Sequence, residues 1–581
     1  MSTQTSNPAP TAPHFPEQVT GMYILAEALK RLSLDTVYGL VGIPVTEAAY
    51  AMQKVGVKFV GFRFEQQAGM AAATHGYLTK TPGVLLTVSS LGFMNGLTAT
   101  ANATVNCYPM IQISGASDPT MVDMNMGTYE QLDQFNTAKP LVKAAFRCSH
   151  AKDIPSAVAR AYRAAVSGRP GGVYIDMTTP ALAEIMNRED AEKLFYQPVD
   201  LYSPVAPNQA AVDRAVELLA SAKRPAILLG KGAAYAQVDD KIKKLIETYK
   251  IPYLPMSMAK GLMPDNGPMS ALSCRSDIME KSDVVMIIGA RLNWMLSFGR
   301  GKWNPAIKFI QLDVEPQEMD VNVPIAAPVV GDMGLSLDAI LAGLEGKAMQ
   351  ADPAWLASIQ AETKVKNAKF AERLKTVKSP MDHWTALSAV KPIIEANPDI
   401  ILINEGANTL DDTRDAIDMS LPRHRVDCAT WAIMGMGMGS TVGAAVATGK
   451  SVVAIEGDSA FGFSGMDFAT ICRFKLPVTV VIFNNGGIYN NVGVNPSTDP
   501  AIEHDPAPTT LDLAARYDKM GEVFGAANYY VKTPEELSKA LTEAIALKAP
   551  AIIDVQLAAD AGKESGHIGY LNPAPLIDYT V

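Results

Sequence analysis

The stretch VVAIEGDSAFGFSGMDFATICRFKLPVTVVIFNNGGIY, residues 452–489, decides the fold of this chain. It begins with an apolar run, turns at Gly457-Asp458-Ser459 and continues into a segment with helical spacing. A second apolar run, Val478–Phe483, ends in two asparagines and two glycines. The pattern predicts strand, loop, helix, strand and loop. In a parallel sheet both loops emerge at the carboxyl edge, where ligands usually bind.

The two loops offer oxygen ligands for a metal ion. Asp458 supplies a carboxylate, Asn485 an amide oxygen and Gly487 a backbone carbonyl. Such hard ligands suit Mg²⁺, which keeps water and phosphate in the rest of its octahedron. Each loop alone is also a common turn. The pair resembles the metal and diphosphate motif of thiamine diphosphate (ThDP) enzymes, with Ser459 as a known variant. The resemblance implies that Gly457, Ser459, Ala460 and Asn485 contact the cofactor.

Composition excludes several classes of protein. The 581 residues are 48% hydrophobic and 19% charged, which is typical of a globular chain with several domains. A net charge of −10 argues against a nucleic-acid surface. Five scattered cysteines without a Cys-x-x-Cys motif indicate buried thiols in a reducing compartment. Because no apolar run reaches membrane length, we expect a cytoplasmic protein that binds neither membrane nor nucleic acid.

Apolar runs separated by helical spacing recur along the whole chain. They predict the α/β class, with three doubly wound parallel-sheet domains. The resemblance to ThDP enzymes implies that these domains are of the ThDP decarboxylase type. The clearest predicted strands are 36–38, 84–88, 110–113, 173–175, 226–229, 284–288, 309–312, 400–403, 452–455, 478–482 and 552–555. The predicted division is a disordered tail (1–18), a pyrimidine-binding domain (19–200), a central domain (210–346), a helical linker (347–379), a diphosphate-binding domain (380–558) and a C-terminal segment (559–581).

ThDP chemistry also requires a carboxylate that binds the cofactor's aminopyrimidine. Glu65 fits because it follows the apolar-rich Val57–Phe62 and precedes an Ala/Gly-rich segment that allows close helix packing. An exposed glutamate at a helix start is the alternative. In the glycine-rich stretch Trp431–Gly439, Met436 matches the apolar residue that props the cofactor in its bent form. The glycines between the methionines suggest close backbone approach to a ligand, although core methionines are the alternative.

Across about 18–575 the chain resembles the oxalyl-CoA decarboxylase family, and 2-hydroxyacyl-CoA lyases share fewer of its segments. The segments that carry the resemblance are Tyr38–Pro44, Tyr129–Glu130, Ser167–Gly172, Gly230–Gln237, Pro255–Gly261, Gly289–Trp294, Asn404–Leu410 and Gly457–Gly465. The resemblance implies decarboxylation of oxalyl-CoA to formyl-CoA and CO₂ through a ThDP ylide and a carbanion-enamine. It also implies a CoA thioester substrate and a homo-oligomer, at least a dimer and usually a dimer of dimers, with each cofactor between two subunits.

Residue roles follow from the same resemblance. Tyr129, Glu130, Tyr489 and Ser565 match catalytic positions, and the C-terminal segment matches a lid that closes over the site. The residues matched to substrate binding are Lys260, Arg423, His424, Ser565, Gly566 and His567. In the central domain, five residues match contacts to ADP as an activator: Arg169, Lys231, Arg291, Asp313 and Asp332. A surface charge run is the alternative for the residues matched to the CoA phosphates, and structural ion pairs are the alternative for the five matched to ADP.

The chain departs from the family pattern in places that bear on the substrate. Phe64 replaces a histidine before Glu65, and Ser90–Phe93 replaces an Ala-Pro-Gly-Phe sequence. Gln131 replaces an acid after Glu130. Asn490 and Asn491 stand where the family has a basic residue and glycine. Loss of that positive charge leaves a 2-hydroxyacyl-CoA lyase as an alternative function. A non-catalytic nucleotide-binding regulator is the alternative from another class, and the presence of Glu65 with the metal ligands argues against it.

Overall fold

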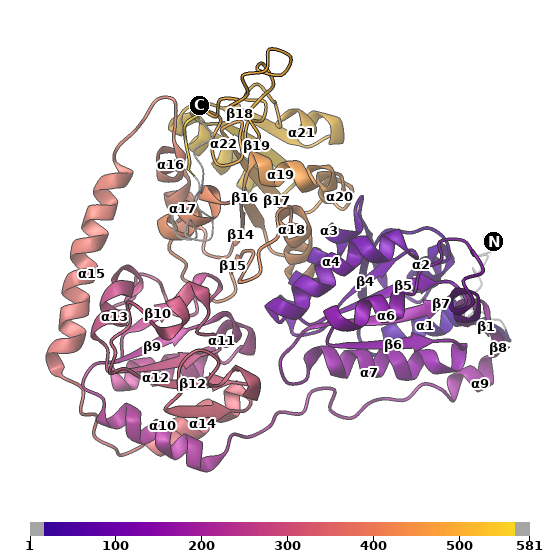
Figure 1. Ribbon diagram of the computed structural model, residues 1–581, viewed down its shortest axis with the longest axis horizontal. Coiled ribbons are helices and arrows are strands. Elements are labelled where there is room, and N and C mark those ends of the chain that lie inside the picture. Colours follow the sequence, from indigo (N-terminus) through magenta and orange to yellow (C-terminus); the bar gives the residue numbers. More distant parts are fainter. Residues whose placement is uncertain (1–16, 564–581) are drawn as a thin grey trace, which may run out of the picture.

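The computed structural model describes residues 17–563, which form three α/β domains at the corners of a triangle (Figure 1). Each domain is built on its own parallel sheet. Inner strands such as β5 and β17 are buried along their whole length, because helices cover the sheets. Such strands read as continuous apolar runs. The predicted fold class is therefore confirmed.

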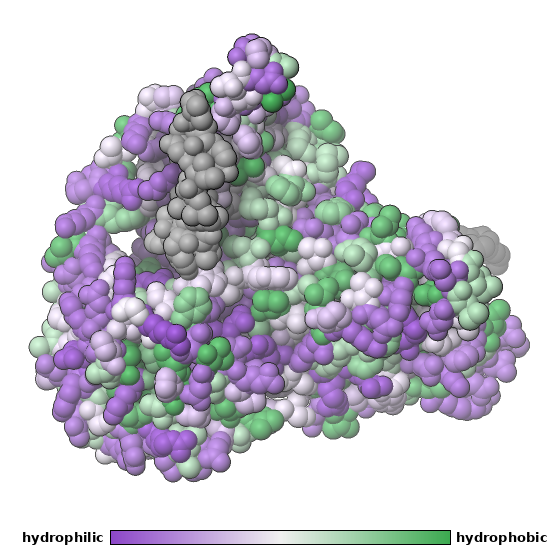
Figure 2. Space-filling view, in the orientation of Figure 1, coloured by the Kyte–Doolittle hydropathy of each residue, from purple (hydrophilic) through white to green (hydrophobic). Residues whose placement is uncertain are grey.

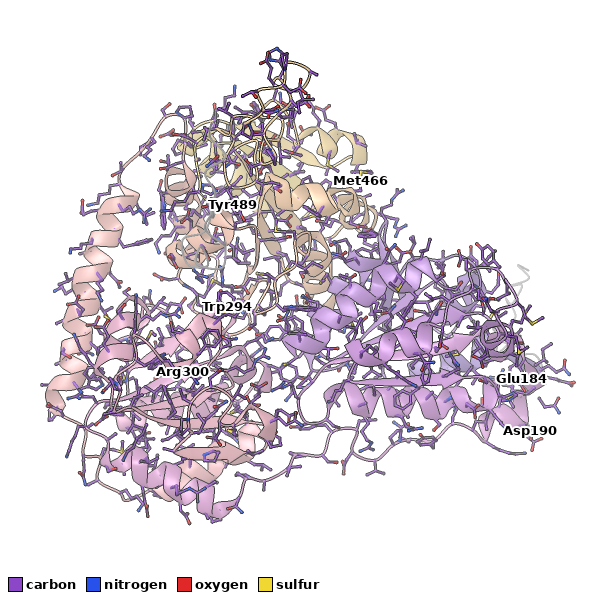
Figure 3. The ribbon with its side chains drawn as sticks, viewed as in Figure 1. Glu184, Asp190, Trp294, Arg300, Met466 and Tyr489 are labelled. Carbon is purple, nitrogen blue, oxygen red and sulfur yellow. The ribbon has the colours of Figure 1, made fainter. Side chains whose placement is uncertain are left out.

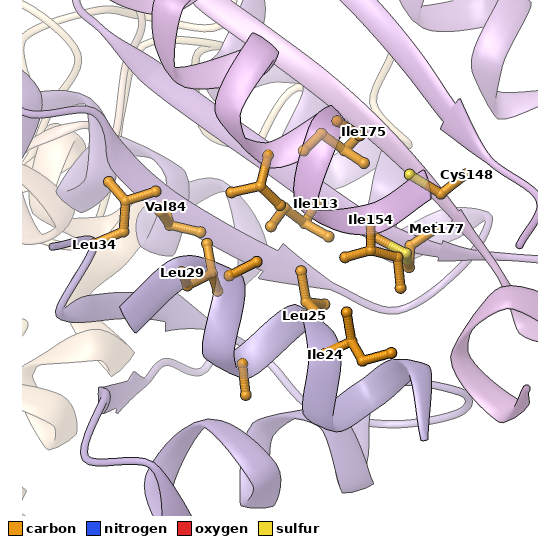
Figure 4. Packing of buried hydrophobic residues seen from close by; sticks show 14 of the residues in the cluster. Ile24, Leu25, Leu29, Leu34, Val84, Ile113, Cys148, Ile154, Ile175 and Met177 are labelled. Carbon is orange, nitrogen blue, oxygen red and sulfur yellow. The ribbon is translucent and has the colours of Figure 1, made fainter. Parts of the chain in front are cut away.

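The first domain has a six-stranded sheet in the order β3-β2-β4-β5-β7-β6. Its strands are β2 (Thr36–Gly39), β3 (Lys58–Gly61), β4 (Gly83–Thr87), β5 (Met110–Ala116), β6 (Ala144–Cys148) and β7 (Gly172–Thr178), and β1 (Gln18–Thr20) pairs antiparallel with β8 (Ile185–Asn187). Its helices are α1 (Gly21–Arg31), α2 (Thr46–Lys54), α3 (Glu65–Thr79), α4 (Leu91–Asn106), α5 (Pro119–Asp123), α6 (Gln134–Ala138), α7 (Ile154–Val166), α8 (Thr179–Ala183) and α9 (Arg188–Glu192). Figure 4 shows Leu25 and Leu29 of α1 packed against Ile113 and Ile175 of the sheet.

The middle domain has a five-stranded sheet in the order β10-β9-β11-β12-β13. Its strands are β9 (Pro225–Leu229), β10 (Tyr253–Pro255), β11 (Val284–Ile288), β12 (Lys308–Asp313) and β13 (Ala327–Val330). Its helices are α10 (Gln209–Ser221), α11 (Lys231–Ala236), α12 (Asp239–Tyr249), α13 (Arg275–Lys281) and α14 (Met333–Leu344). A long helix, α15 (Pro353–Leu374), then runs along the outside of the molecule to the third domain (Figure 1).

The third domain has a six-stranded sheet in the order β15-β14-β16-β17-β19-β18. Its strands are β14 (Ile401–Glu405), β15 (Arg425–Val426), β16 (Val452–Gly457), β17 (Val478–Asn484), β18 (Ala527–Val531) and β19 (Ala551–Gln556). Its helices are α16 (His383–Ala396), α17 (Asn408–Ala416), α18 (Gly437–Thr448), α19 (Asp458–Ser464), α20 (Phe468–Arg473), α21 (Lys519–Phe524) and α22 (Pro534–Leu547). Strands β16 and β17 are neighbours, so the two predicted ligand loops leave the sheet side by side.

Helices α3 and α18 join the first and third domains. A Cβ built on Gly439 would lie 2.4 Å from the Gln67 carbonyl oxygen, and one on Gly443 would lie 2.4 Å from that of Ala71. Only glycine allows two helix backbones to approach this closely. The Ala/Gly-rich segment after Glu65 was expected to pack closely against a helix, and it does.

The described part of the chain shows two further properties. Its cysteines are all free thiols, of which Cys148 and Cys274 are buried as expected, whereas Cys107, Cys428 and Cys472 are only partly buried. Between residues 17 and 563, no helix combines the length and hydropathy that a membrane span requires. The exact boundaries predicted between the domains stay predictions.

Candidate functional site

The ends of β16 and β17 bring the predicted metal ligands together. Asp458 begins α19, and its Oδ2 accepts hydrogen bonds from the backbone amides of Gly486 at 2.7 Å and Gly487 at 3.2 Å. Its Oδ1 accepts one from Ser459 at 2.8 Å. Asp458 and Asn485 are 2% and 4% exposed, so the loops form a buried cradle. A carboxylate, an amide oxygen and a carbonyl form a donor set of the kind that Mg²⁺ takes in proteins.

Burial also sets the charge of this cradle. Desolvation raises the pKa of Asp458 to about 6, although three backbone amides stabilise its ionised form. A divalent cation would favour the ionised carboxylate and offset that cost. Within residues 17–563, no three histidine, cysteine or acidic side chains converge as a metal centre. The predicted magnesium site does not need such a cluster, because it uses one carboxylate.

Glu65 lies on the first domain, at the first residue of α3, and is 6% exposed. Asn95 of α4 donates a hydrogen bond from its Nδ2 to Glu65 Oε2 at 3.1 Å. A Cβ on Gly92 would lie 3.1 Å from Glu65 Oε1, so the start of α4 closes over the carboxylate. Sequence reasoning missed Asn95. Its place just after the substituted Ser90–Phe93 segment is the signal that could have found it.

Tyr129 and Glu130 lie beside this carboxylate region, on the loop before α6. Ser89 donates a hydrogen bond to Glu130 Oε2 at 2.6 Å, and Ser89 begins the turn that leads into α4. Tyr129 is 64% exposed in the single chain. The first domain thus gathers Glu65, Asn95, Glu130 and Tyr129 near one end of its sheet. No described hydrogen bond or ion pair joins this group to the cradle of Asp458.

The methionine predicted to support the cofactor is enclosed by protein. Met436 is 5% exposed and packs against Met70 and Ala99 of the first domain. Met434, two residues earlier, is 40% exposed and faces the large cavity described next. The role of Met436 in supporting the cofactor stays a prediction, and Met434 is a second candidate for that role. The glycines around them mainly allow protein contacts: a Cβ on Gly437 would lie 2.1 Å from Glu456 Oε1.

A cavity of about 1700 Å³ opens between the middle domain and its neighbours. All five residues predicted to bind ADP line it: Arg169, Lys231, Arg291, Asp313 and Asp332. It extends to Glu405 at the end of β14 and to Met434. Figure 3 marks Trp294, which also lines the cavity, and Tyr489 on the third domain. The tertiary structure therefore brings the predicted nucleotide residues together in one place.

The cations of this group already have protein partners. Arg169 pairs with Glu318, Lys231 donates to the Asn106 carbonyl, and Arg291 donates to the Val105 carbonyl at 3.1 Å. These contacts cross between the first and middle domains. Burial lowers the pKa of Lys231 to about 8 and raises that of Asp313 to about 6. Asp332 caps α14 and accepts a hydrogen bond from Tyr202 at 2.5 Å.

The predicted CoA-binding cations are separated by the fold. Lys260 lines the cavity but is 1% exposed, lies 3.3 Å from Asp265 and donates to the Arg414 carbonyl at 2.7 Å. Arg423 makes two hydrogen bonds with Asp239, at 2.9 and 2.8 Å, and does not line the cavity.

His424 also lies away from the cavity, and its ring bonds the Pro422 carbonyl and Lys450, each at 2.9 Å. Burial lowers the pKa of His424. Arg423 is thus held in an ion pair within the protein, whereas the alternative left by the sequence was an exposed surface charge run. The role of these residues in substrate binding stays a prediction.

Other cations of the cavity wall were missed. They are Lys80, Arg275, Lys302, Lys366, Arg373, Lys391 and Arg414. Arg275 and Arg414 come from different domains, and burial together with the charge of Arg414 lowers the pKa of Arg275. Arg414 also pairs with Asp411 at 2.9 Å and with Asp415 at 3.5 Å, so nearby carboxylates already offset part of this positive charge. Arg414 follows the segment Asn404–Leu410 that carries the family resemblance, which is the signal that could have found it.

Tyr489 is joined to the last described residues. The Asn485 amide donates to the carbonyls of Tyr489, at 2.8 Å, and of Ala561. Asn490 donates to the Gly562 carbonyl at 3.3 Å. The segment 558–563 thus lies on the loop that follows the metal cradle. The predicted residues Ser565, Gly566 and His567 lie outside the described residues.

Two buried glutamates lie side by side beneath the glycine-rich turn. Glu405 and Glu456 are paired neighbours on β14 and β16, and they are 2% and 0% exposed. Burial raises the pKa of Glu405 to about 7, and burial together with the charge of Glu405 raises the pKa of Glu456.

Comparison with known proteins identifies the three domains. The N-terminal TPP binding domain, the central domain and the C-terminal TPP binding domain of thiamine pyrophosphate enzymes match residues 19–137, 212–340 and 410–555. The chain is 51% identical to an oxalyl-CoA decarboxylase of Escherichia coli over 96% of its own length and 98% of that protein. It is 39% and 35% identical to 2-hydroxyacyl-CoA lyases of Arabidopsis thaliana and Homo sapiens, over 96% of the chain and 99% and 97% of those proteins.

Proposed function

The chain belongs to the thiamine pyrophosphate enzymes, and we propose that it is a lyase that decarboxylates oxalyl-CoA to formyl-CoA and carbon dioxide. The near full-length similarity to an oxalyl-CoA decarboxylase carries this proposal, because it spans all three domains. The thiamine cofactor, when bound, supplies an electron sink for the pair released as carbon dioxide leaves.

The residues of the chain have separate tasks in this proposal. Asp458, Asn485 and Gly487 hold Mg²⁺ and with it the diphosphate of the cofactor. Glu65, oriented by Asn95, holds the proton that it shares with the aminopyrimidine ring. The cavity takes the CoA part of the substrate, and the cations of its wall, Arg275 and Arg414 among them, are the candidates for binding its phosphates. Glu130, held by Ser89, orders water near the reacting carboxylate.

A panel of CoA thioesters tests the function. Purified enzyme with ThDP and Mg²⁺ is offered oxalyl-CoA and, in separate assays, a 2-hydroxyacyl-CoA. We expect kcat/KM for oxalyl-CoA to exceed that for the 2-hydroxyacyl-CoA by about four orders of magnitude, the discrimination that a site built to bind a polar substrate group can give. The reverse preference would make the enzyme a 2-hydroxyacyl-CoA lyase.

The lyase is the second candidate, for a specific reason. Asn490 and Asn491 follow Tyr489, so that loop brings no positive charge toward an anionic oxalyl group. A neutral substrate would lose less from that absence. A non-catalytic nucleotide-binding regulator is less well supported, because Glu65 and the metal ligands are all present. Undetectable ThDP binding in a titration with Mg²⁺ would favour the regulator.

We further propose that ADP activates the enzyme and that the enzyme is a cytoplasmic homo-oligomer, at least a dimer. The five residues gathered at the cavity support the ADP site. We expect Asp313→Ala to abolish calorimetric ADP binding while turnover without ADP stays unchanged; unchanged ADP binding would contradict the site. Figure 2 shows hydrophobic surface on the face where the first domain meets the third. The exposed apolar residues of these two domains support self-association, among them Ile43, Leu91, Met94, Phe463 and Met466.

A further inference from the structure

Two side chains from different domains hold the backbone of residues 435–439, which leads into the first turn of α18 and is here called the 435–439 turn. Glu405 accepts hydrogen bonds from the amides of Gly435 and of Gly437, the latter at 2.6 Å. Gln67, in the first turn of α3, donates from its Nε2 to the Gly435 carbonyl. The Gln67 Oε1 accepts from the amide of Gly439 at 2.9 Å. Four hydrogen bonds thus hold five residues of backbone, and the pair Glu405 and Gln67 is here called the clamp.

The clamp is deeply buried. Glu405 is 2% exposed and Gln67 is 1% exposed, so water cannot replace either side chain without a rearrangement. Breaking such bonds leaves the amides of the turn unsatisfied, which costs the full penalty of desolvation. A Cβ on Gly437 would lie 2.7 Å from Glu405 Oε2, so glycine is required where the carboxylate meets the backbone.

The neighbouring glutamate does not take part. Glu456 lies beside Glu405 in the sheet and is fully buried. Neither of its carboxyl oxygens has a hydrogen-bond partner in the described part of the chain. The two glutamates therefore share their depth, size and side-chain direction, but only Glu405 grips the turn. This contrast provides a matched control.

The position of the turn gives the clamp a function. Met434, immediately before the turn, is 40% exposed on the cavity wall, and Met436 lies inside the turn. Gln67 stands two residues after Glu65, so the same helix start carries both the clamp and the carboxylate. We propose that Glu405 and Gln67 are positioning residues that hold the 435–439 turn where it supports the bound thiamine cofactor. This inference rests on the proposed function of the site.

Two measurements on Glu405→Gln and Gln67→Met test the proposal. In the cofactor-free protein, we expect amide hydrogen exchange of the 435–439 turn to accelerate about tenfold or more, because its buried hydrogen bonds are lost. In the enzyme loaded with ThDP and Mg²⁺, we expect exchange of the cofactor's C2 proton for deuterium to slow about tenfold or more, because a mispositioned cofactor loses its reactive geometry. The KM for the CoA thioester should change little.

Glu456→Gln is the control, and both exchange rates should stay within about twofold of wild type, because no hydrogen bond to the turn is lost. Wild-type rates in both clamp variants would overturn the proposal. So would slower C2 exchange that merely follows a lower melting temperature or weaker ThDP binding. If Glu405→Gln does not fold, the Gln67 variant still decides. Failure of the wild type to bind ThDP would contradict the proposed function, while amide exchange would still test the clamp.

Discussion

Single carboxylates differ in this protein by what they touch. Glu65 accepts one hydrogen bond from Asn95 and keeps its second oxygen free of described hydrogen bonds. Asp458 instead uses both oxygens to accept three backbone amides. The first arrangement leaves an oxygen that can share a proton with a ligand. The second fixes a carboxylate in one orientation, as a metal ligand requires.

Replacing Glu65 tests the first of these roles. In Glu65→Gln we expect kcat to fall about 10²–10⁴-fold, because an amide cannot exchange a proton with the aminopyrimidine. ThDP affinity should change little, since Mg²⁺ and diphosphate contacts hold the cofactor. Glu47→Gln, an exposed first-turn glutamate on α2, serves as the control and should keep wild-type turnover. Wild-type turnover in Glu65→Gln would disprove its role.

The pKa of Asp458 predicts how metal binding depends on pH. Because burial raises this pKa to about 6, protons compete with Mg²⁺ for the carboxylate below that pH. We expect the apparent Mg²⁺ affinity to fall about tenfold for each pH unit below about 6, and to change little above about pH 7. Mg²⁺-dependent ThDP binding measured across this range checks the sign. Equal affinities at both ends would exclude Asp458 as a ligand.

Among the elements, the segment 558–563 and the loop after β17 depend on each other. Gly562 has φ +113°, and a Cβ there would lie 2.2 Å from the Tyr489 carbonyl oxygen. The Asn490 amide also donates to the Gly562 carbonyl. Any side chain at 562 must therefore move the segment, the loop or both. This contact puts the beginning of the C-terminal part of the chain beside the proposed metal cradle.

Gly562→Ala should therefore lower kcat/KM by about tenfold or more while the melting temperature changes little, because the clash lies outside the sheets. Gly525→Ala is the matched control: its φ is +73°, but nothing lies within 4 Å of an added Cβ. It should cost only the strain of a left-handed alanine, about 1 kcal/mol of unfolding free energy, with wild-type kinetics. Equal kinetics in the two variants would contradict the coupling.

The strands show what local sequence can predict. The inner strands of all three sheets were predicted because they are buried on both faces and read as continuous apolar runs. In these three sheets, the strands that were not predicted are the edge strands: β3, β6, β10, β13, β15 and β18. An edge strand is shorter or partly exposed and has no such run; β6 is mostly half-buried and β15 has two residues.

At the scale of the whole molecule, Glu65 and Asp458 lie on different domains. No described hydrogen bond or ion pair joins the residues gathered around Glu65 to the cradle of Asp458. If each cofactor lies between the first domain of one subunit and the third domain of another, two inactive variants can rescue each other. A mixed dimer of Glu65→Gln and Asp458→Ala subunits contains one site in which both residues are wild type.

We expect co-refolded or co-expressed mixtures of these two variants to recover up to about a quarter of wild-type activity, since half of the random dimers contain one intact site. Each variant alone should be nearly inactive. Equal amounts of Glu65→Gln and the double variant carrying both changes provide the control, because no intact site can form. Absence of recovery in a verified mixed dimer would place both residues in one subunit's site.

The sequence alone determined the sheets' inner strands, the ligand loops and the order of the domains. Asp458 and Asn485 could be predicted together because both follow neighbouring strands that are close in sequence. Tertiary structure alone decided what the distant groups do. It paired Arg423 with Asp239, buried Met436 against the first domain, and joined Gln67 to Gly435 across 368 positions. Such contacts depend on how whole domains pack, and no local pattern of residues encodes that geometry.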